Sequence, residues 1–317
     1  FVAPTDDWQA AIVANAHVVL APGTYYPTQT LEIGFSVTPV AQTQPGASPT
    51  VIISGSPIPL GAPIAKIDGE GLPFETNITF SGLEFKDGAG TNGGAVHQAG
   101  ARAYFTDCKF TNNQADHGAA IYTTPAAMPA SCTPWVTGCG GKGGSPSSES
   151  FWTMITRCAF NTNTAVHDGG AINVDDGTVQ IALSTFEGNT AGGSGGAIKV
   201  RKGGIDILAS IIHGNTAAAL GGGIAVAGDQ AVSVDLIQDC VVSGNTAVQG
   251  GGIGVTPMIA MAHRMHTLGR PFDLYYSCAK RANAGYLDDL AAAPWASNVH
   301  YHFSDEGSRV DLDAVIG

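Results

Sequence analysis

The chain has 317 residues, of which 44% are hydrophobic and 43 are glycine, and its formal net charge is −12. This length is enough for one elongated domain. The acidic balance argues against a nucleic-acid partner, and no run of 18 apolar residues occurs that would span a membrane.

The first 60 residues are typical of the start of a repeat domain. Asp6 or Asp7 can cap a short helix, and a strand is predicted at Val18–Leu20. A turn at Pro22–Tyr25 and a further strand at Val51–Gly55 follow. This order resembles the N-terminal cap of pectate-lyase-like β-helices. A cap is expected, because an open coil end would expose apolar side chains and unpaired strand edges.

A repeated pattern runs through the middle of the chain. Each copy has a bulky apolar anchor and ends in a glycine run closed by Ile or Val. Every copy but the first, which has Gly88, carries an asparagine three residues after the anchor and an alanine five residues after it. The anchors are Phe85, Phe110, Phe160, Phe186, Ile212 and Val242. The asparagines are Asn113, Asn163, Asn189, Asn215 and Asn245. A period near 26 residues indicates a solenoid, in which each repeat buries its apolar face against its neighbours.

The residue types favour β-structure over helical repeats. Gly and Asn recur at fixed places where they would break helices, and apolar residues alternate in short runs such as Val179–Leu183. Coils stacked in register at about 4.8 Å would let the asparagines form an amide ladder. The sequence therefore predicts an all-β fold, a right-handed single-stranded parallel β-helix. A short helical cap is expected at its N-terminal end, and an irregular, partly helical cap at its C-terminal end.

The anchor spacing contains one irregularity. The 50 residues between Phe110 and Phe160 correspond to one coil plus an insertion, or to two coils of which one has degraded. Prolines and glycines place the insertion at about 124–150, as a loop. Within it, Cys132 and Cys139 flank a short stretch and are predicted to form a disulfide.

The remaining cysteines and one sequon bear on the compartment. Cys108 and Cys158 share one column of the repeat and are either disulfide-bonded or buried free thiols. Asn77 opens an Asn-Ile-Thr sequon and is a candidate for glycosylation. Together with a charged fraction of only 13%, these features favour an extracellular or cell-surface location. The chain opens with Phe1, which we interpret as a processed start.

The paired motifs F-x-x-N and G-G-A-I resemble those of chlamydial polymorphic outer membrane proteins. The matching segments are Phe110…Asn113 with Gly118–Ile121, Phe160…Asn163 with Gly169–Ile172, and Phe186…Asn189 with Gly195–Ile198. The resemblance covers about 77–255. It implies a surface-exposed β-helical module linked to adhesion.

The repeat pattern stops after Val255, which predicts two parts. Residues 1–256 form the β-helix with its N-terminal cap. Residues 257–317 form a C-terminal cap or a tail that docks on a partner. Within the second part, the Ala- and Leu-rich segment Ala279–Ala293 could form one helix.

A ligand groove is expected on the outward face that follows each glycine run. The residues there in the middle copies are polar or aromatic and are candidates for glycan contact. They are Tyr122, Asn173, Asp175, Lys199 and Arg201. In a polysaccharide lyase, a base removes a proton beside a carboxylate that a cation neutralises, roles open to Lys199 or Arg201. Asp175 and Asp176 could then hold Ca²⁺.

A simpler interpretation is that these charges pair with one another. Asp175 and Asp176 face Arg201 and Lys202 one coil further on, so cross-coil ion pairs on a solvated face suffice. Under this interpretation no cofactor is needed.

Two histidines raise the question of a metal site. His117 and His167 both precede a glycine run, beside Asp116 and Asp168, and this set would suit Zn²⁺. The next copies lack these residues, so turn chemistry on a wet edge explains them and no metal site is predicted.

Regular turn residues dominate the sequence, and no nucleophile motif occurs. The sequence therefore predicts a noncatalytic extracellular or surface β-helix with a structural or adhesive role. Its expected partners are other protein chains of an assembly, together with glycans. One alternative is a polysaccharide lyase or hydrolase that acts on acidic glycans, and another is a viral surface spike.

Overall fold

The computed structural model describes residues 3–4, 6, 9–13, 17–33, 38–41, 51–68, 77–124, 152–226, 232–248, 262, 265–278, 281 and 287–308. The chain divides into two compact units, Phe1–Gly252 (unit 1) and Ile253–Gly317 (unit 2). The insertion proposed from the sequence, with Cys132 and Cys139, lies outside the described residues. Among the residues that are described, no helix is long and apolar enough to cross a membrane.

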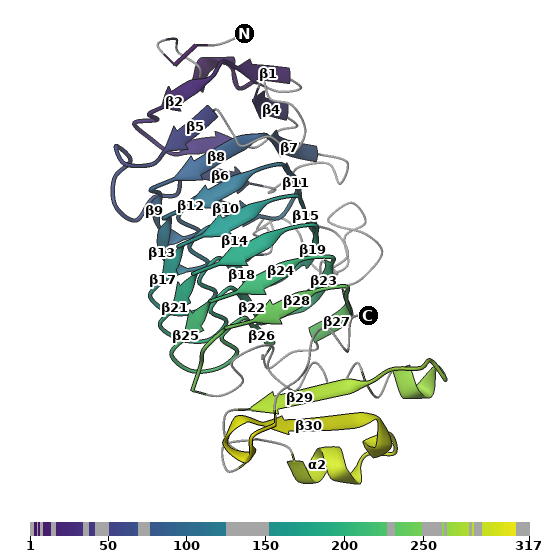
Figure 1. Cartoon of the computed structure of the whole chain (residues 1–317). Coiled ribbons are helices and arrows are strands. Elements are labelled where there is room, and N and C mark those ends of the chain that lie inside the picture. Colours follow the sequence, from purple (N-terminus) through teal and green to yellow (C-terminus); the bar gives the residue numbers. More distant parts are fainter. Residues whose placement is uncertain are drawn as a thin grey trace, which may run out of the picture. The chain divides into compact units, whose positions relative to one another are not determined.

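Unit 1 is a parallel β-helix, as the repeat predicts (Figure 1). Strands from successive coils pair in parallel to form four sheets, and the order of strands within each sheet follows the order of the coils. The predicted N-terminal helix is a single 3₁₀ turn, η1 (Gln9–Ala11). The segment predicted as a turn at Pro22–Tyr25 instead contains a strand that begins at Gly23 and pairs with the next coil.

Each coil contributes at most one strand to a given sheet, so neighbours in a sheet come from successive coils. The first sheet contains β1 (His17–Leu20), β4 (Thr38–Ala41), β7 (Asn77–Ser81), β11 (Arg102–Thr106), β15 (Trp152–Thr156), β19 (Thr178–Ala182), β23 (Gly203–Leu208) and β27 (Val232–Gln238). The second contains β2 (Gly23–Tyr25), β5 (Val51–Ser54), β8 (Leu83–Lys86), β12 (Lys109–Thr111), β16 (Ala159–Asn161), β20 (Thr185–Glu187), β24 (Ile211–His213) and β28 (Val241–Ser243). The third contains β3 (Leu31–Ile33), β6 (Ala65–Asp68), β10 (Val96–Ala99), β14 (Ile121–Thr124), β18 (Ile172–Val174), β22 (Ile198–Val200) and β26 (Ile224–Val226). The fourth, shorter sheet contains β9 (Ala89–Asn92), β13 (Gln114–His117), β17 (Thr164–Ala165), β21 (Thr190–Ala191) and β25 (Thr216–Ala217).

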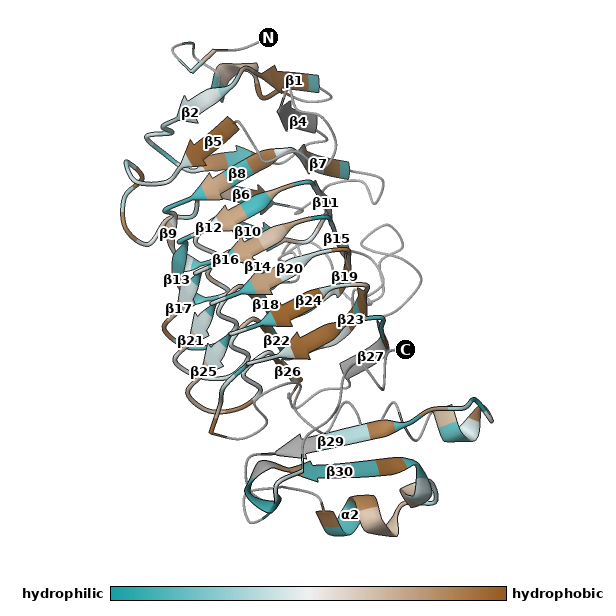
Figure 2. Cartoon of the chain, in the orientation of Figure 1, coloured by the Kyte–Doolittle hydropathy of each residue, from teal (hydrophilic) through white to brown (hydrophobic). Residues whose placement is uncertain are grey.

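The apolar anchors form a continuous stack inside unit 1. The rings of Phe85, Phe110, Phe160 and Phe186 are nearly parallel, with successive centroids 5.3, 4.7 and 4.5 Å apart. Phe110 pairs directly with Phe160 in the second sheet, so the 50-residue spacing is one coil plus an insertion. Each fully buried ring contributes about 2–3 kcal/mol, and offset stacking adds about 0.5–1.5 kcal/mol per pair. In Figure 2, strand β5 of the second sheet is coloured as hydrophobic, whereas strand β13 of the fourth sheet is coloured as hydrophilic.

The repeat asparagines are linked into a single file of hydrogen bonds. Asn163 Nδ2 donates to Asn189 Oδ1 at 2.9 Å, and Asn189 Nδ2 donates to Asn215 Oδ1 at 2.8 Å. Each of these oxygens also accepts the backbone N–H of the preceding asparagine. Asn113, Asn163, Asn189 and Asn215 are all 0% exposed. The ladder therefore satisfies buried backbone and amide groups at the same corner of every coil.

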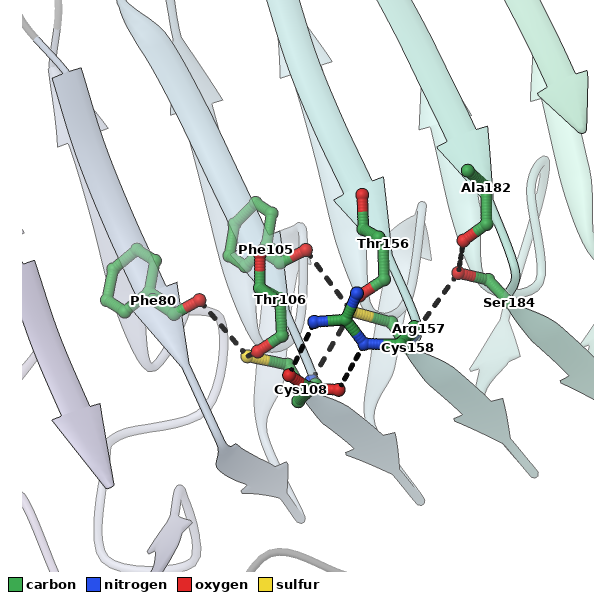
Figure 3. A network of polar contacts seen from close by, with 10 residues as sticks. Phe80, Phe105, Thr106, Cys108, Thr156, Arg157, Cys158, Ala182 and Ser184 are labelled. Carbon is green, nitrogen blue, oxygen red and sulfur yellow. Dashed lines mark hydrogen bonds and ion pairs between the residues drawn. The ribbon is translucent and has the colours of Figure 1, made fainter. Parts of the chain in front are cut away.

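A second ladder of small side chains precedes the anchors (Figure 3). The backbone N–H of Cys108 donates to Cys158 Sγ at 3.4 Å, and that of Cys158 donates to Ser184 Oγ at 3.1 Å. Cys and Ser thus accept the same backbone hydrogen bond in successive coils. Cys108 and Cys158 are free thiols, which decides between the two alternatives drawn from the sequence. Burial raises the pKa of the Cys158 thiol well above its ordinary value, and its hydrogen bond with Cys108 adds to this.

Unit 2 contains a parallel strand pair with a helix between its strands in the sequence. β29 (Leu274–Cys278) pairs in parallel with β30 (Val299–Phe303), and α2 (Leu287–Ala292) lies on the connection. Its core includes Leu274, Leu290 and Trp295. Two short 3₁₀ turns, η3 (Ala296–Asn298) and η4 (Ser304–Glu306), flank β30. Parallel strands need such a crossover, so unit 2 is a small βαβ element.

Candidate functional site

Three of the predicted glycan-contact residues lie in one file on the outer face of the third sheet. Tyr122 on β14 pairs with Asn173 on β18, which pairs with Lys199 on β22. On either side of Lys199, Ile198 and Val200 are 0% exposed and point into the core. Since side chains alternate along a strand, the file points away from the core.

Asp175 and Arg201 lie just past β18 and β22 and form an ion pair through Arg201 Nε. Burial, followed by the charge of Asp175, raises the pKa of Tyr122 to about 12. Asp175 and Arg201 therefore satisfy each other, and the Asp175 charge acts on the Tyr122 hydroxyl. Because the Arg201 side chain is 49% exposed, this ion pair adds only about 0–1 kcal/mol.

Asp176 is held in the same way. Lys202 Nζ lies 2.7 Å from Asp176 Oδ2, and the N–H of Gly177 donates to Asp176 Oδ1 at 2.7 Å. The cross-coil ion pairs considered from the sequence are thus formed. Either carboxylate would have to leave its cation before it could bind Ca²⁺.

Asn173 and Lys199 differ from this network. They are 5% and 7% exposed, although they occupy outward positions of the sheet. Neither side chain has a hydrogen bond or an ion pair with any residue that the structure describes. Burial lowers the pKa of Lys199, and the Asp168 carboxylate partly opposes this. That carboxylate is itself held by the backbone N–H of Ser194 at 2.7 Å.

Glycine turns pack against the sheet beside these two residues. A Cβ on Gly169 would lie 2.9 Å from Asn173 Cβ, and one on Gly195 would lie 2.8 Å from the backbone nitrogen of Lys199. Only a glycine backbone can pack so closely against the outer face of β18 and β22. The turns therefore pack directly against the strands at the positions of Asn173 and Lys199.

Imidazole rings border the file beside Tyr122. The ring centroids of His97 and His117 lie 5.4 and 6.4 Å from that of Tyr122, and His117 and His167 lie 5.1 Å apart. Burial lowers the pKa of His97. Across the described part of the chain, no group of three or more His, Cys, Asp or Glu side chains could hold a metal ion. His97 was not among the predicted site residues, although its position in the preceding copy matches that of Tyr122 and could have identified it.

Other features lie apart from this file. Asn77, the glycosylation candidate, is exposed at the start of β7. A recess of about 540 Å³ near the N-terminal coil is lined by Gln9, Ile12, Gln29 and Glu32, among others. It combines no acid with a base, so it is a weaker candidate than the file.

Two segments of unit 1 are similar to a known family of repeats. Two segments of this chain match the Chlamydia polymorphic membrane protein repeat. They are residues 107–124 and 184–201. Each repeat runs from the small-residue ladder through the asparagine to the third sheet, so the first includes Tyr122 and the second includes Lys199. The polymorphic membrane protein repeat indicates a surface β-helix module.

Curated relatives match only a short part of the chain. The phenoxybenzoate dioxygenase subunit beta of Ectopseudomonas oleovorans is 43% identical over 67 residues, which is 21% of this chain and 20% of that protein. The tert-butanol monooxygenase / tert-amyl alcohol desaturase reductase subunit of Aquincola tertiaricarbonis is 35% identical over 63 residues, or 20% and 19% of the two chains. The phthalate dioxygenase reductase of Burkholderia cepacia is 40% identical over 53 residues, 16% of each. The chain thus spans at most about a fifth of these relatives. No solved structure matches it.

Proposed function

We propose that unit 1 is a structural or adhesive module at the cell surface that contacts glycans through the outer file of the third sheet. The observation that carries this proposal is the in-register file of Tyr122, Asn173 and Lys199, bordered by imidazole rings. Aromatic rings can pack against a sugar ring while neighbouring polar groups bind its hydroxyls. The spacing of about 4.8 Å between coils allows an extended polymer to contact several coils at once.

Binding to immobilised neutral and acidic polysaccharides tests the proposal. Tyr122→Ala should weaken retention of the full chain about tenfold, which corresponds to roughly 1.4 kcal/mol for one aromatic contact. Tyr104 on β11 is a matched control, because it is a partly exposed tyrosine on the first sheet. Tyr104→Ala should leave retention unchanged. Equal losses in the two variants, or no retention of the unaltered chain, would refute glycan contact by this file.

The catalytic alternative finds less support. Asp175 and Asp176 each have a cation partner, so this pair of carboxylates is not free for Ca²⁺. The lowered pKa values of Lys199 and of His97 beside the file are the features that suit a general base. Incubation with polyuronates, with and without Ca²⁺, should yield no unsaturated product. If product formed and Lys199→Met abolished it, unit 1 would be a lyase.

A second proposal concerns the segment shared with the reductases. We propose that it lies in unit 2, because a β–α–β crossover with parallel strands is typical of α/β sheets and unit 2 has a similar length. A sequence comparison with the reductases that uses residues 253–317 alone should still find the shared segment. The same comparison with residues 1–252 alone should not find it. The opposite result would refute this placement. Because only about a fifth of those proteins is matched, we expect the full chain to lack reductase activity.

A further inference from the structure

Four exposed apolar side chains gather where the chain turns from the first sheet of unit 1 into the second. They are Leu183 (56% exposed), Leu208 (39%), Ile211 (46%) and Val241 (39%), and we call this group the apolar corner. They come from three successive coils, and Ile211 pairs directly with Val241 in the second sheet. Strand β24 of this corner is coloured mostly as hydrophobic in Figure 2. A contiguous group of exposed apolar side chains indicates a contact with another protein surface.

The same corner is charged in the preceding coils. Both side-chain oxygens of Asp107 accept hydrogen bonds from Arg157 at 2.8 Å, and Lys109 Nζ lies 3.6 Å from Glu84. Leu183 occupies the position of Arg157 one coil further on, with the same φ of 53°. The corner therefore changes from ion pairs to exposed apolar side chains along the solenoid. The core does not require this change, because these side chains lie outside it.

The residues of this corner form three columns along four successive coils. The column that ends the strands of the first sheet contains Thr156, Ala182, Leu208 and Gln238. The column in the turn has positive φ throughout and contains Arg157, Leu183, Ala209 and Asp239. The column that begins the strands of the second sheet contains Ala159, Thr185, Ile211 and Val241.

These columns are complementary to themselves when the order of the coils is reversed. A second copy with its coils in the opposite order would place the first of the four coils on the fourth and the second on the third. Arg157 would then face Asp239 of the second copy, so opposite charges would meet. A large apolar side chain would meet an alanine in each column: Leu183 with Ala209, Leu208 with Ala182, and Val241 with Ala159.

The opposite arrangement, with like coils facing each other, is less favourable. Asp239 would then face Asp239 of the second copy, and like charges repel. Reversed coils are the order that a two-fold axis across the solenoid produces, and each contact then occurs twice. The pattern of charge and size thus selects one arrangement of two copies.

From this pattern we propose that the apolar corner is the contact surface of a symmetric dimer, in which two copies of unit 1 pack side by side with their coils in opposite order. The apolar side chains form the centre of the contact, and the pairs between Arg157 and Asp239 form its rim. Both charged groups can reach a second copy. The Arg157 side chain is 42% exposed although it is paired with Asp107, and Asp239 is exposed beside Gln238, which donates to it at 3.1 Å. The net charge of −12 opposes association at long range, so these local contacts have to hold the dimer.

Sedimentation equilibrium of the full chain tests whether this surface forms a dimer. The unaltered protein should dimerise with a Kd in the micromolar range, as expected for a contact of modest size. Leu208→Asp places a charge at the centre of the contact and should raise the Kd at least about thirtyfold. Leu60→Asp is the matched control, because Leu60 is 91% exposed and lies outside the apolar corner, and it should leave the Kd unchanged. Circular dichroism checks that each variant is folded.

Disulfide trapping tests the order of the coils. One variant carries Ala159→Cys and the other Val241→Cys, and both also carry Cys240→Ser, because Cys240 is a partly exposed free thiol next to position 241. The proposed arrangement places position 159 of one copy against position 241 of the other. Like positions of the two copies would be offset by three coils, or about 14 Å, whereas a disulfide needs Cα atoms within about 7 Å. An oxidised mixture of the two variants should therefore give dimers linked between positions 159 and 241, identified by tandem mass spectrometry, and neither variant alone should give dimers linked through its new thiol.

Three results would overturn the proposal. One is a protein that stays monomeric at about 100 µM, well above a micromolar Kd. Another is an equal change of the Kd in Leu208→Asp and Leu60→Asp, since the dimer would then use a different surface. The third is cross-linking of either variant with itself as readily as in the mixture, since the coils would then not lie in opposite order.

Discussion

Removal of one interior asparagine should destabilise unit 1 far more than removal of the last one. The Asn189 side chain makes four hydrogen bonds, two as donor and two as acceptor. At about 1 kcal/mol each for fully buried groups, Asn189→Ala should cost about 4 kcal/mol. Asn245 makes three, with only partial burial, so water can replace them and Asn245→Ala should cost about 1 kcal/mol.

Urea unfolding followed by far-ultraviolet circular dichroism measures both costs. Because a solenoid is stabilised by contacts between neighbouring coils, an interior defect should also broaden the transition, and intermediates would then become populated. Midpoints are compared with the unaltered protein at matched concentration. If the two variants differ by less than about 1 kcal/mol, the ladder does not stabilise the stack in the way its geometry implies.

Three further predictions test the turns, the lowered pKa of Lys199 and the thiols. Gly195→Ala should prevent folding, because its Cβ would lie 2.3 Å from a backbone oxygen. Gly214 has a similar φ of +64°, but a Cβ there would have nothing within 4 Å. Gly214→Ala should therefore lower the free energy of unfolding, measured in urea, by only about 1–2 kcal/mol. Lys199→Met should raise the melting temperature at pH 7, because burial lowers the pKa of Lys199 and the unfolded chain holds its proton more tightly. This gain should shrink as the pH rises and vanish above the ordinary pKa of 10.5, and a gain that is independent of pH would contradict it. In thiol titration of the folded protein, Cys240→Ser should remove a group that reacts more readily than Cys158, because Cys240 is partly exposed whereas Cys158 is 2% exposed. Cys158→Ser should leave the titration unchanged.

The stacking of unit 1 could be predicted from the sequence because it places identical residues in register. Phe110, Phe160 and Phe186 recur for a physical reason, since each ring packs on its equivalent in the next coil. The spacing of 50 residues could not be resolved in the same way. An insertion and a degraded coil leave the same gap in the pattern, and only the direct pairing of Phe110 with Phe160 separates them.

The fold of unit 2 was harder to predict from its sequence. It contains no repeat, and its two strands pair across about 20 residues that include α2. A parallel pair of this kind depends on a crossover that leaves no periodic signal. The Ala- and Leu-rich segment correctly indicated a helix, of which the structure describes Leu287–Ala292.

The sequence could predict which residues of the candidate site point outward, but not which groups surround them. Alternation along β22 places Lys199 outward, and an outward lysine is ordinarily solvated. The sequence could not show that the turn at Gly195 packs against this strand, because that contact depends on the path of the turn. Pairing of Asp175 with Arg201 was foreseen from the offset of one coil, but the effect of the Asp175 charge on Tyr122 was not.

The interior positions of the solenoid repeat the same residues from coil to coil, whereas the outer file does not. Each interior column repeats one solution to one problem: the phenylalanine stack buries apolar surface, and the asparagines satisfy backbone groups at the corner of each coil. The outer file repeats no residue, because successive coils carry Tyr122, Asn173 and Lys199. Packing therefore does not dictate these residues. Burial lowers the pKa of Lys199, and the next coil carries Ala225 at the equivalent position. Residues that packing does not dictate, on an otherwise regular solenoid, are typical of a binding site.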